Sequence, residues 1–249
     1  MKRNFIKTMA LSMSLLFLMS GCSTNKEEGK PSESADIAAS SVADANTTDL
    51  VEPGEVVLTP EEQKTIDSLT EVTGDIYLLD CYSDYKLEDY LASNITDGMG
   101  MDYWLTSELT HNIPTGNLKD FGCSSFATLS DAGDHLFGRN YDIYNGKSLV
   151  VRTAPEDGYA SIGIVDLNHL NMYQGSYDID SEDGKLLLLA APWCICDGIN
   201  EMGLGMSVLQ LDETHVVTDT EKGDLMLYAA TRVVLDKCAT VDEAIELLD

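Results

Sequence analysis

The chain has 249 residues, of which 15 are Lys or Arg and 43 are Asp or Glu, so its formal net charge is −28. Hydrophobic residues make up 44% of the chain, which is typical of a globular protein and excludes a wholly disordered one. A surface this negative repels phosphate backbones, so we expect no nucleic-acid partner. Six cysteines are too few for a disulfide scaffold, and each needs its own explanation.

Residues 1–22 have the pattern of a bacterial lipoprotein signal peptide. Three basic residues come first, residues 9–19 are apolar, and small residues precede Cys22. A transmembrane helix is the alternative, but the apolar run is shorter than the roughly 20 residues that a span needs. The pattern resembles the lipobox, whose cysteine receives a diacylglycerol and becomes the new N-terminus. We therefore predict that Cys22 is lipidated and anchors the protein to the extracytoplasmic face of a bacterial cell membrane.

The composition changes after the signal. Residues 23–58 are rich in Ser, Ala, Asp, Glu and Thr, and they lack the apolar surface that would offset the entropy of ordering, which predicts a disordered acidic tether. Thr59 and Glu62 form a capping-box pattern, so structure is expected to begin there. Short apolar segments follow at 75–81 and 87–91, and their type stays open.

The second half of the chain has the pattern of strands followed by helices. Residues 123–129 and 135–143 flank a turn that contains Gly133, which predicts a β-hairpin. A helix is expected at 224–237, and a capping box at 240–243 begins another. Further strands are expected at 148–152, 159–165, 186–191, 193–196 and 204–211. This order indicates an α+β fold.

Cys123 is the candidate nucleophile, with a buried structural thiol as the alternative. It begins the predicted hairpin directly after Gly122, and the return strand carries Arg139 and Asp142, so the pairing brings a cation and a carboxylate near one thiol. If the bond between Gly122 and Cys123 is cleaved, the freed α-amine, with a reference pKa of about 7.7–8.0, can take the proton of its own thiol. None of the four histidines forms an evident pair with a cysteine.

The other cysteines have simpler interpretations. Cys194 and Cys196 lie two residues apart, but no second Cys/His pair at zinc spacing accompanies them, so we expect core residues rather than a metal site. Cys81 and Cys238 are interpreted as packing residues, with a disulfide as the alternative. We expect neither a metal nor a cofactor.

Three ordered motifs carry a family resemblance: Cys123-Ser-Ser-Phe-Ala-Thr, Leu136-Phe-Gly-Arg-Asn-Tyr-Asp142 and Asp197-Gly-Ile-Asn-Glu-Met-Gly-Leu-Gly205. The arginine lies 16 residues and the aspartate 19 residues after the cysteine. This half of the chain resembles the choloylglycine hydrolase and acid amidase superfamily, the linear-amide C–N hydrolases with an N-terminal nucleophile. The resemblance implies the αββα four-layer sandwich of those hydrolases, of which this chain would form part.

The resemblance also implies roles for single residues. It makes Cys123 the nucleophile, Arg139 the cation that lowers the thiol pKa and contacts the substrate, and Asp142 the partner of the Cys123 α-amine. Gln210 stands where bile-salt hydrolases carry an oxyanion-hole Asn, which weakens the bile-salt interpretation. The candidates for oxyanion or substrate contacts are Asn140, Asn200 and Gln210.

By the same resemblance, residues 59–122 are a pro-segment and 123–249 the N-terminal part of the catalytic domain. The long pro-segment favours the branch similar to acid amidases or penicillin acyltransferases, with a small amide as the substrate: an N-acyl amide, a bile-salt conjugate or a compound like penicillin V. Hydrolase and acyltransferase activity both stay open. Because the last helix has no C-cap and the family's later Asn and Arg are not found, we expect the domain to continue beyond Asp249 and the 249 residues alone to be inactive. The alternative is a lipid-anchored binding or structural protein with an inactive amidase fold.

Overall fold

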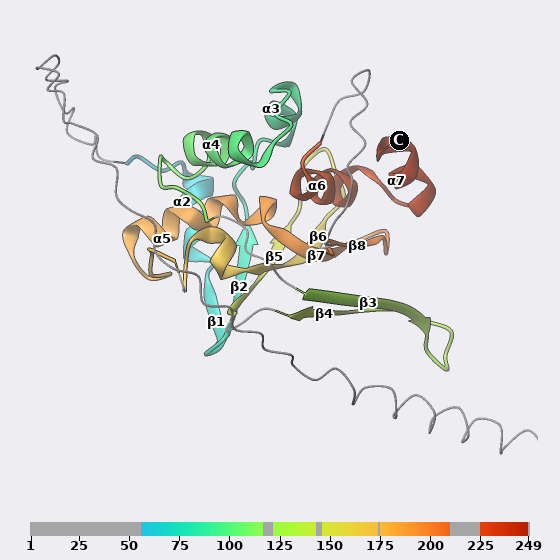
Figure 1. Cartoon of the computed structure of the whole chain (residues 1–249). Coiled ribbons are helices and arrows are strands. Elements are labelled where there is room, and N and C mark those ends of the chain that lie inside the picture. The colour runs from blue at the N-terminus through green and yellow to red at the C-terminus, as the bar shows by residue number, and fades with distance from the viewer. Residues whose placement is uncertain (1–55, 117–121, 143–145, 174, 210–224, 249) are drawn as a thin grey trace, which may run out of the picture. The chain divides into compact units, whose positions relative to one another are not determined.

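The computed structural model describes residues 56–116, 122–142, 146–173, 175–209 and 225–248, and the statements below concern these residues (Figure 1). In chain order the elements are α2 (Pro60–Asp67), β1 (Thr70–Thr73), β2 (Ile76–Cys81), α3 (Leu87–Ala92), α4 (Gly98–Glu108), β3 (Gly122–Leu129), β4 (His135–Asp142), β5 (Ser148–Thr153), β6 (Ser161–Asp166), η1 (Leu167–Leu170), α5 (Glu182–Leu187), η2 (Leu188–Trp193), β7 (Ile195–Asn200), β8 (Gly205–Ser207), α6 (Leu227–Lys237) and α7 (Val241–Leu248). Within these ranges no helix is both long and apolar enough to span a bilayer.

A six-stranded sheet in the order β1-β2-β5-β6-β7-β8 forms the centre of the fold. Strands β2 and β5 pair in parallel, and every other neighbouring pair is antiparallel. Leu79 of β2 and Leu149 and Val151 of β5 are fully buried side by side. The segment that precedes Cys123 therefore supplies two strands of the same sheet as the segment that follows it.

Helices cover one face of this sheet, and the β3–β4 hairpin lies over the other (Figure 1). A Cβ placed on Gly198 of β7 would lie 3.0 Å from Leu235 of α6, so the side of β7 that Gly198 occupies faces the helices. Side chains alternate along a strand, and Asp197 accordingly points to the opposite face, where it bonds Arg139 of the hairpin.

The hairpin has the predicted strands and turn. Cys123 pairs with Tyr141, and Gly133 in the connecting turn has a φ of 88°, which a residue with a side chain rarely adopts. Phe126 covers Gly138 on the neighbouring strand, where a Cβ would come within 2.3 Å of its ring. The predicted hairpin is thus confirmed.

Trp193 ties the helical layer to the segment before Cys123. Its ring is fully buried and its centroid lies 4.7 Å from that of Tyr90 and 5.5 Å from that of Trp104. Its indole nitrogen donates to the carbonyl of Tyr85 at 2.7 Å. This cluster joins three separate parts of the chain into one core.

The predicted strand at 186–191 is wrong, because α5 and η2 are helical there. Ser181 caps α5 by accepting a bond from the N–H of Gly184 at 3.0 Å. The residues from Leu186 to Trp193 are all buried, so their hydrophobicity shows no period that distinguishes a helix from a strand. An apolar run of this kind fits either a helix or a strand. Here the N-cap residue Ser181 favours the helix.

Other expectations fare better. The capping box of α2 is confirmed, with Thr59 Oγ1 accepting from the Glu62 N–H at 3.1 Å and Glu62 accepting from the Thr59 N–H at 2.7 Å. Helix α6 and strands β5 and β6 lie where they were predicted. Helices, sheet and hairpin make three stacked layers of mixed α and β structure. The fourth layer of the predicted αββα sandwich is not among the described residues and stays a prediction.

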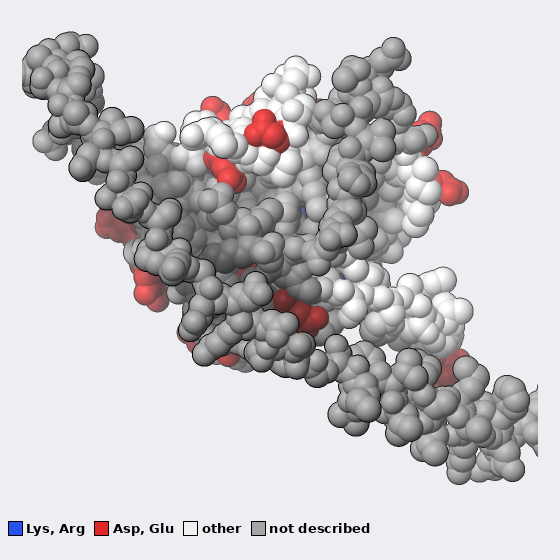
Figure 2. Space-filling model, viewed as in Figure 1, with Lys and Arg blue, Asp and Glu red and all other residues white. Residues whose placement is uncertain are grey.

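Acidic side chains are scattered over the face of the described part that Figure 2 shows, and basic ones hardly appear there. Two arginines, Arg139 and Arg232, have side chains only 4% and 0% exposed. Burial removes these two cations from an already negative surface. Each of them pairs with an aspartate inside the fold.

Candidate active site

The thiol of Cys123 lies beside a buried guanidinium. Cys123 is the second residue of β3 and is half-buried. Arg139 pairs with Ser125 across the hairpin, so its side chain lies on the same face as that of Cys123. The Nη2 atom of Arg139 donates to Cys123 Sγ at 3.0 Å. The hairpin register places these two groups on one face of the hairpin.

Three further contacts fix the guanidinium. Arg139 donates through Nη1 to Asp197 Oδ1 at 2.6 Å and through Nη2 to the carbonyl of Val208 at 2.6 Å. Its Cζ atom lies 4.5 Å from the centroid of the Tyr141 ring. Burial alone lowers the pKa of Arg139, but Asp197 and the Cys123 sulfur raise it above its ordinary value, so the cation is kept. Burial in turn raises the pKa of Asp197, and Arg139 opposes that shift.

Asp142 lies at the end of β4, directly opposite Gly122 in the ladder. It accepts a bond from Asn140 Nδ2 at 2.6 Å. Alternation along β4 places Asn140 and Asp142 on the face away from the thiol, and both are exposed. Asp142 is therefore next to the main chain of the Gly122–Cys123 bond rather than next to Sγ.

Asn200 has a structural position away from the thiol. It is 4% exposed and its amide donates to the carbonyls of Leu235 and Cys238 at 3.0 and 2.7 Å, at the end of α6. Its side-chain carbonyl accepts from the N–H groups of Met202 and Leu204. These four hydrogen bonds hold the Asn200 side chain between the β7–β8 turn and the end of α6. The structure does not bring Asn200 to the candidate site. Gln210 and Cys22 lie outside the described residues.

Sequence reasoning assigned no role to Asp197, which the structure places at the site. The residue begins the third family motif, and that was the only signal for it. Its contact with Arg139 depends on how the hairpin stacks on the sheet, which a strand pattern does not specify. The carbonyl of Val208 was missed for the same reason.

The five described cysteines are free, so the alternative of a disulfide between Cys81 and Cys238 is wrong in this structure. Burial raises the pKa of the Cys81 thiol to about 11 and that of Cys196 to about 12. It also raises the pKa values of Cys194 and Cys238. These groups stay protonated at neutral pH, which leaves Cys123, half-buried beside Arg139, as the thiol in the setting of a nucleophile.

A family model described as linear amide C–N hydrolases, choloylglycine hydrolase family, matches residues 123–249. The match covers just over half of the chain and begins at Cys123 itself. The chain belongs to this family, as its three motifs predicted. Comparisons with curated proteins and with solved structures gave no match.

Proposed function

We propose that the protein is a lipid-anchored, extracytoplasmic amidase in which Cys123, freed by cleavage after Gly122, hydrolyses the C–N bond of small N-acyl amides. The observation that carries the proposal is the donation from Arg139 Nη2 to Cys123 Sγ at 3.0 Å, with a guanidinium that is itself held by Asp197. A cation at this distance favours the thiolate, which is the reactive form of cysteine. The start of the family match at Cys123 supports the same residue.

Self-cleavage would free the N-terminal nucleophile. The Cys123 sulfur attacks the carbonyl carbon of Gly122, the C–N bond breaks, and the acyl group moves to sulfur as a thioester. Water then hydrolyses the thioester, which leaves a carboxylate on Gly122 and a free α-amine and thiol on Cys123. Asp142, which lies opposite Gly122 in the ladder, would bind the new ammonium group.

Amide hydrolysis then uses the same two groups of Cys123. The α-amine takes the thiol proton, the thiolate attacks the amide carbonyl, and the ammonium returns the proton to the leaving amine. Water, activated by the α-amine, hydrolyses the acyl-thioester and releases the acid. Arg139 keeps positive charge beside the sulfur throughout. The substrate class includes N-acyl amides, bile-salt conjugates and compounds like penicillin V.

Cleavage would not separate the two pieces. Strand β2, which precedes the cleavage point, pairs with β5 over six residue positions, and Leu79 in it is fully buried. Tyr85 donates to Asp236 of α6 at 2.7 Å. A segment that supplies strands and core residues stays bound after its covalent link is cut, since its removal would expose the apolar face of the sheet.

The test uses the complete protein produced by its bacterial gene. N-terminal sequencing of the mature form is expected to give one chain that starts at Cys123, and assays against N-acylethanolamines, conjugated bile salts and penicillin V are expected to show release of an amine. Cys123→Ala is expected to stay uncut and inactive, while Cys81→Ala, a matched change at a free cysteine of β2, is expected to behave as the wild type. A mature form that is intact across the Gly122–Cys123 bond would contradict the proposal.

Lipidation is tested separately. Metabolic labelling with a radioactive fatty acid is expected to label the wild type and not Cys22→Ser, which should leave the membrane fraction. Labelling of Cys22→Ser at the wild-type level would contradict the anchor, while the amidase proposal would stand.

A further inference from the structure

We propose that Tyr141, anchored by the buried His169, is a positioning residue that holds the Arg139 guanidinium against the Cys123 thiol. The inference rests on the proposed function, in which Cys123 is the nucleophile. Tyr141 is the cross-strand partner of Cys123, and its side chain shares a face of the hairpin with those of Cys123 and Arg139. Tyr141 is therefore adjacent to both the Cys123 thiol and the Arg139 guanidinium.

The Tyr141 ring restrains Arg139 in a direction that its hydrogen bonds leave open. The bonds from Arg139 to Asp197 and to the Val208 carbonyl lie in the plane of the guanidinium, because its N–H groups lie in that plane. They fix the position within the plane but resist tilting only weakly. The Tyr141 ring, over which Arg139 Cζ lies at 4.5 Å from the centroid, limits movement of the guanidinium toward the ring and attracts the cation.

The ring is in turn held by its hydroxyl. Tyr141 Oη lies 3.2 Å from Nε2 of His169, which is 2% exposed at η1. Burial lowers the pKa of His169, and a bond to the backbone of Cys194 opposes this, so the imidazole is neutral at pH 7. Burial raises the pKa of Tyr141, with nearby Cys196 adding to the shift, so the phenol keeps its proton. The Tyr141 hydroxyl and His169 Nε2 therefore share a hydrogen bond between two neutral groups.

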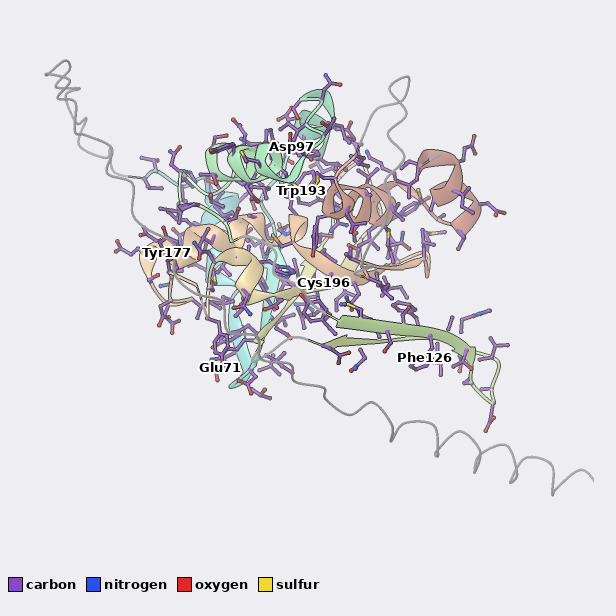
Figure 3. All side chains as sticks on the ribbon, in the orientation of Figure 1. Glu71, Asp97, Phe126, Tyr177, Trp193 and Cys196 are labelled. Carbon is purple, nitrogen blue, oxygen red and sulfur yellow. The ribbon has the colours of Figure 1, made fainter. Side chains whose placement is uncertain are left out.

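The groups around His169 are consistent with this assignment. Its Nδ1 atom lies 3.6 Å from Sγ of Cys196, a buried thiol on β7 (Figure 3). The ring of Tyr228 packs edge-on against the imidazole with centroids 5.7 Å apart. Two charged neighbours act in opposite directions, because Asp166 raises the pKa of His169 and Arg139 lowers it. Burial and the Arg139 cation together outweigh the Asp166 carboxylate, so the pKa of His169 is lowered.

Packing of the core alone would require neither the Tyr141 hydroxyl nor the His169 imidazole. A phenylalanine fills the space of the Tyr141 ring, and a buried hydroxyl that meets an imidazole gains little net stability over two apolar groups of the same shape. What the pair adds is a fixed ring orientation, since a directional bond restricts rotation and sliding. The orientation matters here because the ring face supports Arg139.

The experiment measures the reactivity of Cys123 directly. The complete protein is treated with iodoacetamide from pH 5 to 10, and alkylation of Cys123 is followed by peptide mass spectrometry, a readout that does not need amide turnover. Tyr141→Leu, which removes the ring, is expected to slow alkylation at pH 7 about tenfold and to move the pH profile of alkylation to higher pH. Tyr141→Phe keeps the ring and loses the anchor, so a slowing of about threefold is expected.

Two controls separate positioning from folding. Tyr90→Phe removes a hydroxyl from another buried tyrosine, which packs on Trp193, and is expected to leave the pH profile unchanged. Thermal unfolding of every variant shows which of them fold. If Tyr141→Leu does not fold, Tyr141→Phe decides, and a wild-type profile in Tyr141→Phe overturns the proposal.

A double-mutant cycle tests the role of His169. In His169→Leu the imidazole that bonds the Tyr141 hydroxyl is gone, so combining it with Tyr141→Phe should slow alkylation no further than the slower single variant. Multiplicative effects of the two changes would overturn the anchoring. A wild type that is alkylated at Cys123 but releases no amine would refute the proposed function, while the alkylation profiles would still decide the positioning.

Discussion

Arg139 and Asp197 form an ion pair between the two stacked sheets, with Nη1 and Oδ1 2.6 Å apart. The side chains are 4% and 20% exposed. The pair joins the hairpin that carries Cys123 to strand β7, and it is the contact that gives the thiol a fixed cation.

Replacing Asp197 by Asn should therefore destabilise the protein and lower its activity. The change leaves the Arg139 cation buried with a weaker partner, which costs about 2–3 kcal/mol, at the low end because the Asp197 side chain keeps some contact with solvent. Urea unfolding measures the stability, and amide turnover the activity.

A matched control exists on the far strand of the same sheet. Asp80 pairs with Arg152 at 2.5 Å, but there the arginine side chain is 52% exposed. Because solvent screens this pair, Asp80→Asn should change stability little. Equal losses in the two variants would show that burial of the Arg139–Asp197 pair is not the cause.

The charge of Arg139 should control the reactivity of Cys123. Arg139→Met keeps an apolar stem and removes the cation, so alkylation of Cys123 at pH 7 should slow about tenfold or more. Arg139→Lys keeps the charge but cannot donate at once to Asp197, the Val208 carbonyl and the thiol, so it should restore only part of the rate. An unchanged rate in Arg139→Met would remove Arg139 from the site.

The sequence was sufficient for the part of the site that one hairpin builds. Strand alternation and a two-strand register place Cys123 and Arg139 on one face, and both are local consequences of residues 122–142. Asp197 comes from a strand 58 positions away from Arg139, and only the stacking of the sheets brings it there. Periodicity reveals which face of a strand is buried but not which element covers it.

Long-range pairing was also beyond the sequence. The segment at 75–81 showed only a short apolar run, and its parallel partner β5 lies beyond the hairpin in the chain. For Asn200 the sequence suggested a contact with the substrate that the structure does not show. An Asn in a glycine-rich turn motif is equally suited to bind a substrate or to cap a helix. Its buried bonds to the end of α6 show the second use.

The two pieces of a cleaved chain should stay together. After processing, gel filtration under native conditions should give one peak that contains both pieces, since β2 and β5 share a ladder and Tyr85 bonds Asp236. Denaturing electrophoresis of that peak should resolve two bands. Separate native peaks would mean that the segment before Cys123 is released, and that its place in the sheet belongs to the precursor alone.

The buried His169 should make the protein less stable in mild acid. Burial lowers the pKa of His169 below its ordinary value of about 6.5, so on acidification the unfolded chain binds a proton before the folded one does. Stability from this group is full above pH 6.5, falls as the pH drops below that value, and levels off once the pH is below the folded pKa. The slope of the free energy of unfolding is at most about 1.4 kcal/mol per pH unit. Urea unfolding between pH 4.5 and 8 measures it, and the slope should shrink in His169→Gln but persist in His135→Gln, a change at an exposed histidine of β4. A slope of wild-type size in His169→Gln would assign the acid sensitivity to other groups.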